Sequence, residues 1–132
     1  MRPRLPDIRF YTTALFSIAM LLYTAFPIGA HAADWVQVGT FVGAKGVSTD
    51  EYYAPTTVQS FALGELALVR EDVVGQPPAY FQVAIDCHDH EYKFRSVKFT
   101  RAPKAAFGPV SGPHRIVEGS DVAALELYLC ST

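Results

Sequence analysis

The residues best suited to chemistry lie in one short stretch, Asp86-Cys87-His88-Asp89-His90-Glu91. His88 and His90 are two residues apart, so on an extended chain both side chains point to the same side. With Asp86 as an oxygen donor, they could form part of a zinc or copper site. A polar hairpin tip explains the same residues, because Asp and His tolerate turn conformations and stay hydrated there. Since a metal site needs three or four converging ligands, the pattern favours the hairpin tip, and no cofactor is expected.

A second stretch combines positive charge with aromatic side chains, a pattern that could stack nucleobases. The basic residues of this candidate partner-binding surface are Lys93, Arg95, Lys98 and Arg101. The whole chain has 11 basic and 13 acidic residues, so its charge gives no reason to expect nucleic acid. A strand with one solvated face explains the run of lysines and arginines, and docking of a protein partner remains open.

Catalytic patterns are missing from the sequence. It contains no G-x-S-x-G elbow, no phosphate-binding glycine loop and no dinucleotide fingerprint. The adjacent acids Glu71 and Asp72 precede a predicted loop and indicate solvated surface. Cys87 could act as a nucleophile only as a free thiol. We therefore expect a non-enzymatic protein without catalytic residues.

The N-terminal segment has the features of a secretory signal peptide. Three arginines and one aspartate give a net positive start, no charged residue occurs between Phe10 and Ala33, and Ala14–Phe26 is almost wholly apolar. Small residues at Ala30 and Ala32 predict cleavage after Ala32. Residues 1–32 are thus a predicted signal peptide, and residues 33–132 a single domain in the periplasm, at the cell surface or secreted. An uncleaved membrane anchor is the alternative; otherwise membrane contact is expected only during export.

Length and composition agree with one small folded domain. The chain has 132 residues, of which 50% are hydrophobic and 18% charged, and this excludes intrinsic disorder. Its only cysteines are Cys87 and Cys130. In an oxidising compartment such a pair allows one connectivity, so a Cys87–Cys130 disulfide is predicted.

Strand patterns dominate the part of the chain after the signal peptide. The predicted strands are Asp34–Val42, Glu51–Tyr53, Leu63–Glu71, Ala79–Cys87, Tyr92–Arg101 and His114–Val117. A helix remains an alternative for Leu63–Glu71, because short apolar runs are ambiguous. Proline and glycine predict loops over Val74–Ala79 and Ala102–Pro113.

The last apolar run favours a short helix. Ser120 can cap it, and Val122, Leu125 and Leu129 then lie along one side. A strand is the rival, since leucines also alternate with Glu126 and Tyr128. With the helix, the fold class is α+β, and the predicted disulfide would tie the helix to the sheet.

Several short motifs together resemble the bacterial surface-adhesin protein E family. The motifs are Trp35-Val36, Tyr52-Tyr53, Asp86-Cys87, Tyr92–Arg95, Ile116 with Gly119-Ser120, and Cys130. The resemblance implies a small antiparallel β-sheet with a short C-terminal helix tied to the sheet by one disulfide. It also implies export in a Gram-negative bacterium and an adhesin-like role in the cell envelope, contacting extracellular or envelope proteins. The alternative function is a periplasmic metal- or small-ligand-binding protein that uses Asp86, His88 and His90.

Overall fold

The computed structural model describes residues 34–99 and 105–131. The predicted signal peptide, residues 1–32, and Arg101 lie outside these residues. The described elements are β1 (Val36–Val42), β2 (Ser48–Tyr53), the 3-10 turn η1 (Pro55–Thr57), β3 (Gln59–Phe61), β4 (Gly64–Val73), β5 (Ala79–Asp86), β6 (Glu91–Phe99), β7 (Ala105–Phe107), β8 (Ser111–Arg115) and α2 (Asp121–Leu129). None of the helices in this part of the chain is long and apolar enough to span a membrane.

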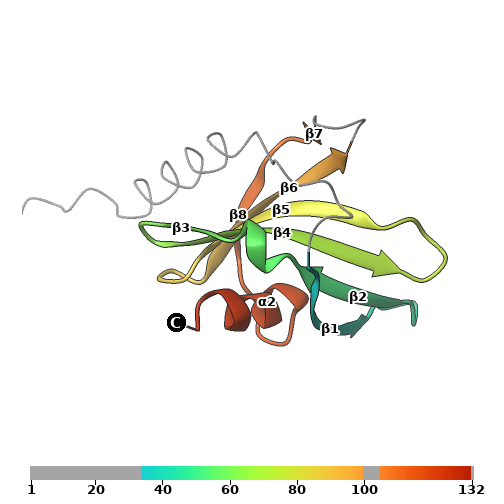
Figure 1. Cartoon of the computed structure of the whole chain (residues 1–132). Coiled ribbons are helices and arrows are strands. Elements are labelled where there is room, and N and C mark those ends of the chain that lie inside the picture. Colours follow the sequence, from blue (N-terminus) through green and yellow to red (C-terminus); the bar gives the residue numbers. More distant parts are fainter. Residues whose placement is uncertain (1–33, 100–104, 132) are drawn as a thin grey trace, which may run out of the picture.

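The strands form one antiparallel sheet in the order β1-β2-β4-β5-β6-β7, which Figure 1 shows with its labels. Two strands lie off this path: β3 pairs with β4, and β8 pairs with β6. The turn η1 separates β2 from β3 along the same edge of β4, because Pro55 lies at its first position and ends the extended run.

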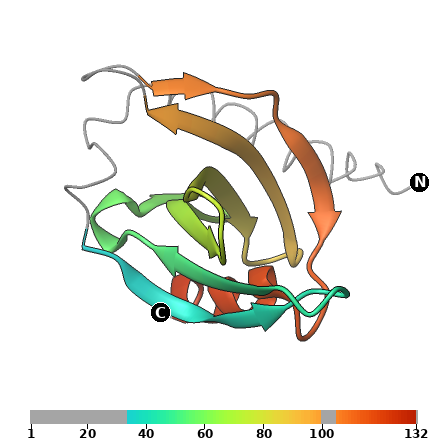
Figure 2. The same ribbon diagram turned by 90° about the vertical axis from the view of Figure 1, so that its right-hand side faces the viewer.

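The helix α2 packs on one face of this curved sheet (Figures 1 and 2). Leu125 and Leu129, both buried, contact a patch of sheet residues that alternate along β4 and β5. That patch consists of Ala67, Val69, Val83 and Ile85. The expected C-terminal helix is therefore confirmed, with the expected apolar side turned to the core.

The opposite face of the sheet carries a second set of buried side chains. Its apolar members include Leu66, Leu68, Ala84 and Val97. At its β1 end, the Arg70 guanidinium lies 4.9 Å from the centre of the Trp35 ring and 4.3 Å from that of Tyr52. These cation–π contacts connect the chain just before β1 to β2 and β4.

The predicted disulfide joins Cys87, directly after β5, to Cys130, directly after α2. The expectation of an antiparallel sheet with a helix tied to it by one disulfide is thus confirmed.

The start of β4 requires a glycine at position 64. A Cβ atom there would lie 1.7 Å from the carbonyl oxygen of Ile85 on β5, so no larger residue fits.

The structure differs from the sequence prediction at several strand boundaries and most of all in one loop: β2 begins at Ser48 and not at Glu51, and β8 ends at Arg115 and not at Val117. The segment Ala102–Pro113 was expected to be irregular, yet its described part contains β7 and the start of β8. Pro113 is tolerated because β8 is an edge strand, where a missing N–H leaves no ladder bond unmade. For Leu63–Glu71 the predicted strand is confirmed as β4, and the helix alternative is wrong.

Candidate functional site

The first candidate group, Asp86, His88 and His90, forms the tip of the β5–β6 hairpin. The Asp86 carboxylate is fully buried and accepts hydrogen bonds from the backbone N–H groups of His88 (2.9 Å) and Asp89 (2.8 Å). His88 is exposed, and His90 adopts a left-handed backbone conformation with φ of 53°. Asp86 therefore organises the turn, as expected of a polar hairpin tip.

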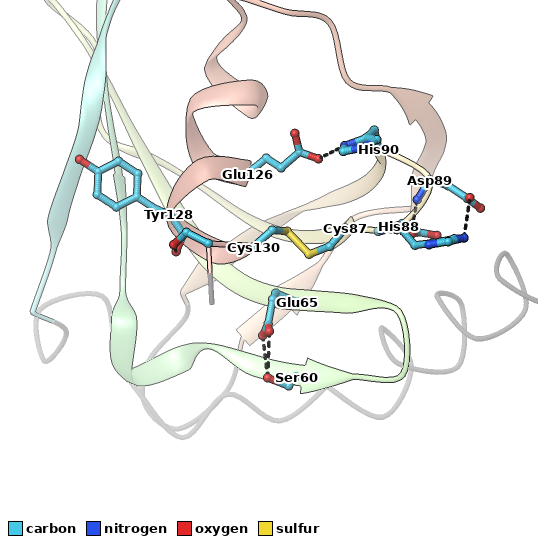
Figure 3. Close-up of a disulfide and its surroundings, with 11 residues drawn as sticks. Ser60, Glu65, Cys87, His88, Asp89, His90, Glu126, Tyr128 and Cys130 are labelled. Carbon is cyan, nitrogen blue, oxygen red and sulfur yellow. Dashed lines mark hydrogen bonds and ion pairs between the residues drawn. A yellow bond between two sulfur atoms is a disulfide. The ribbon is translucent and has the colours of Figure 1, made fainter.

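The His90 side chain points to α2 rather than to Asp86. Its Nδ1 atom lies 2.8 Å from a carboxylate oxygen of Glu126, beside the disulfide (Figure 3). Among the described residues, the one group of three acid, histidine or cysteine side chains close enough to share a metal ion lies elsewhere. The structure does not gather Asp86, His88 and His90 around one point.

The candidate basic surface divides between the two faces of the sheet. Lys93 and Arg95 are buried on the face away from α2, and burial lowers the pKa of both side chains. The Arg95 Nε atom donates to the Gln82 side-chain oxygen at 2.6 Å, and its guanidinium lies over the Phe107 ring. Lys98 is exposed and points to the other side of β6. The described members therefore do not form one continuous solvated stripe.

A different group of side chains is brought together between the sheet and the beginning of α2. It consists of Glu51 on β2, Glu71 on β4 and Asp121, the first residue of α2. One carboxylate oxygen from each residue lies within 4.8 Å of those of the other two. We call these three residues the acidic cluster.

Strand register and helix capping explain why these three carboxyl groups meet. Glu51 and Glu71 are direct partners across the β2–β4 ladder, so both side chains stand on the face that α2 covers. The Ser120 hydroxyl caps α2 by accepting from the Ala123 N–H at 3.2 Å. This cap places Asp121 in the first turn, where a negative charge is stabilised by the helix dipole.

The surroundings of the acidic cluster favour the protonated forms of Glu51 and Glu71. Burial, the hydrogen bond with Asp121 and the negative charges of Asp121 and Glu71 raise the pKa of Glu51 from 4.5 to about 9. Burial and Asp121 also raise the pKa of Glu71. Glu51, only 2% exposed, is therefore protonated at neutral pH and donates to Asp121.

The acidic cluster lines a cavity of about 270 Å³. Its remaining walls are apolar or aromatic: Val69, Phe81, Val83, Tyr92, Phe94, Val122 and Leu125. Burial and the charge of Asp121 raise the pKa of Tyr92, so its phenol keeps its proton. The volume of the cavity is just below the range of ~300–1,000 Å³ typical of small-molecule sites.

Three kinds of chemistry are open to this arrangement. The carboxyl groups can share protons among themselves, as neighbouring carboxylates do when both cannot ionise. They can ligate a divalent cation through oxygen. They can also accept hydrogen bonds from an ammonium group, and the aromatic walls can then contact the rest of the ligand.

Sequence reasoning missed this site. Glu71 was grouped with Asp72 as solvated surface, but it lines the cavity, whereas Asp72 lies 3.1 Å from Arg70. One signal was present in the alternation of β4, where Ala67, Val69 and Glu71 occupy the same face. An acid that follows two core residues at period two marks a carboxyl group turned towards the core.

Comparisons with known proteins give no independent indication of what the cavity holds. No protein-family model, no curated protein and no solved structure matches this chain. The chemistry of the site must therefore be argued from its own residues.

Proposed function

We propose that this chain is an exported, non-enzymatic binding protein of the α+β class, and that it holds a small organic amine in the cavity under α2. The observation that carries the proposal is that one cavity is lined both by three clustered carboxyl groups and by apolar and aromatic side chains. Export is supported by the predicted signal peptide and agrees with the disulfide.

An ammonium group fits the acidic cluster in charge and in the number of acceptors. Its three N–H donors make charge-assisted bonds of about 2.8 Å to carboxylates. One carboxylate oxygen from each of Glu51, Glu71 and Asp121 lies within 4.8 Å of the other two, and entry of the ammonium group would replace the proton that Glu51 shares with Asp121. A bare divalent cation would use the carboxylates alone, whereas an amine with an apolar body also uses Phe81, Phe94 and Leu125.

Binding of benzylamine and of benzyl alcohol tests this proposal, because the two probes share a shape and differ in charge. Calorimetric titration should give benzylamine an affinity of roughly 1 mM, as expected for a fragment of this size, at least tenfold tighter than benzyl alcohol. Binding should release protons, because an ammonium group lowers the pKa of Glu51 and favours its ionised form.

The variants Glu51→Gln and Asp121→Asn should abolish the preference for the amine. Glu65→Gln is the matched control, since Glu65 lies on the same strand as Glu71 but bonds to Ser60 outside the cavity. Equal binding of amine and alcohol, or equal losses in the control, would contradict the proposal. A titration with Ca²⁺ and Mg²⁺ in place of the amine distinguishes the second candidate, a divalent-cation site on the same three acids.

The adhesin-like role implied by the resemblance is a separate proposal about location and partners. The observation that favours it is the agreement of the antiparallel sheet and disulfide-tied helix with the fold that the resemblance implies. Fold alone does not give function. Protease treatment of intact cells tests it: an adhesin is cleaved at once, whereas a periplasmic protein is cleaved only after the outer membrane is opened.

A further inference from the structure

Three aromatic side chains line the cavity that contains the acidic cluster. They are Phe81 on β5 and Tyr92 and Phe94 on β6. We call these three residues the aromatic wall. Each side chain packs against the core on the α2 side of the sheet and is still only half-buried. A ligand in the cavity can therefore cover ring surface that the fold itself leaves accessible.

The rings of the aromatic wall already pack in the two geometries that aromatic pairs prefer. The ring centres of Phe81 and Phe94 are 6.1 Å apart with their planes at 75°, an edge-to-face contact. Those of Tyr92 and Phe94 are 6.0 Å apart with their planes at 23°, a stacked contact. On β8, the His114 ring packs on both β6 rings, 5.3 Å from Tyr92 and 5.8 Å from Phe94. Neighbouring rings thus restrict one another's orientation before any ligand binds.

The carboxyl groups and the aromatic wall stand on neighbouring strands of the sheet. In the order β2-β4-β5-β6, Glu51 and Glu71 occupy the first two strands and the aromatic wall the last two (Figure 1). Adjacent strands are about 4.8 Å apart. From α2, Asp121 approaches the aromatic wall as well, since burial and the charge of Asp121 together raise the pKa of Tyr92. One small molecule can therefore contact both groups.

We infer that the ligand of this cavity is an arylalkylamine, in which a short carbon chain joins an amine to an aromatic ring. This inference rests on the proposed function, because the ammonium group binds the acidic cluster while the ligand's ring packs against the aromatic wall. Stacked and edge-to-face pairs gain about two- to tenfold in affinity beyond the apolar area that they bury. A saturated ring of the same size has no such gain.

Calorimetric titration of the full chain, purified in the form that the cell produces, with benzylamine and with cyclohexylmethylamine tests this inference. The two amines have the same carbon skeleton and the same charge at neutral pH, and only one of them has an aromatic ring. Benzylamine should bind about three- to tenfold more tightly, although the saturated ring is the more hydrophobic of the two. Phe81→Leu and Phe94→Leu should each reduce this advantage to less than about twofold.

Phe99→Leu is the matched control, because Phe99 lies on the same strand as Phe94 but packs on the face of the sheet away from the cavity. It should keep the advantage of benzylamine, and circular dichroism should show all three variants folded. Equal binding of the two amines to the wild-type protein, or an advantage that survives both Phe81→Leu and Phe94→Leu, would overturn the inference and leave amine binding intact. If neither amine binds more tightly than benzyl alcohol, the proposed function fails and the inference fails with it.

Discussion

The two ends of α2 are attached to the sheet by different chemistry. At its C-terminal end, Cys130 is bonded to Cys87, and the His90–Glu126 contact lies beside that bond (Figure 3). At its N-terminal end, the Ser120 cap places Asp121 against Glu51 and Glu71. One attachment is covalent, and the other depends on protons held between carboxyl groups.

Different conditions should therefore weaken the attachment of the two ends of α2. A reductant acts on the C-terminal end and leaves the acidic cluster intact. A rise in pH acts on the N-terminal end, because ionised carboxylates so close together repel one another. Reductant and pH should therefore change the stability of the protein independently, each through one end of α2. Substitutions at the two ends should differ in the size of their effect.

Breaking the covalent end should have the largest effect. Cys130→Ser removes a bond that joins residues 43 positions apart, and loss of that constraint costs about 4 kcal/mol. The melting temperature should fall by roughly 15–30 °C for a domain of this size. Thermal unfolding followed by circular dichroism measures the change.

The double variant with serine at both Cys87 and Cys130 is the control for the free thiol left by the single change. It should melt close to Cys130→Ser, and a reductant should have no further effect on either variant. A wild-type protein whose melting temperature is unmoved by reductant would show that α2 is held in place without the disulfide.

The proton-dependent end should give the next largest effect. The folded state raises the pKa of Glu51 from 4.5 to about 9, so the folded chain binds a proton more tightly than the unfolded chain. The contribution of Glu51 to stability is then greatest below about pH 4.5 and is lost progressively up to about pH 9. Glu51→Gln keeps the shape and cannot ionise, so it should flatten this slope and stabilise the protein by about 2–4 kcal/mol at pH 8.

Urea unfolding at several pH values measures the slope, and Glu65→Gln serves as the control carboxylate. Glu65 bonds to Ser60 outside the cavity, so its variant should keep the slope of the wild-type protein. Parallel slopes in all three proteins would mean that Glu51 ionises freely in the folded state.

The smallest of the three effects belongs to the helix cap. Ser120→Ala removes the acceptor of the Ala123 N–H and should destabilise the protein by about 1 kcal/mol. Ser131→Ala is the matched control, because its hydroxyl is exposed beyond the other end of α2 and should contribute less than about 0.5 kcal/mol. Urea unfolding of both variants resolves the difference, and equal values would show that the cap is dispensable.

Sequence patterns predicted the disulfide at the C-terminal end of α2 but not the acidic cluster at its N-terminal end. Two cysteines in a chain with a predicted signal peptide allow one bond, and Ser120 with the leucines after it predicted the helix. Glu51, Glu71 and Asp121 lie far apart in the chain and meet only through the pairing of Glu51 with Glu71 and the docking of α2. Such register is a property of the assembled sheet, so no local pattern contains it.

The strands were predictable to different degrees for a related reason. β5 and β6 are long, alternate clearly and are joined by a short hairpin, so their local sequence is sufficient. β7 and β8 are short and contain or adjoin proline and glycine. They are extended because β6 offers them a free edge, and that edge exists only after the rest of the sheet has formed.

The stacking of Trp35 on Arg70 has a practical consequence for spectroscopy. Trp35 is the single tryptophan of the chain, and its ring packs with Arg70 and Tyr80 on the face of the sheet away from the cavity. Indole fluorescence is therefore a one-site optical signal for the β1 end of the molecule. The emission of Trp35 should shift when this end unfolds and stay constant when an amine enters the cavity. A fluorescence measurement can therefore distinguish unfolding from amine binding.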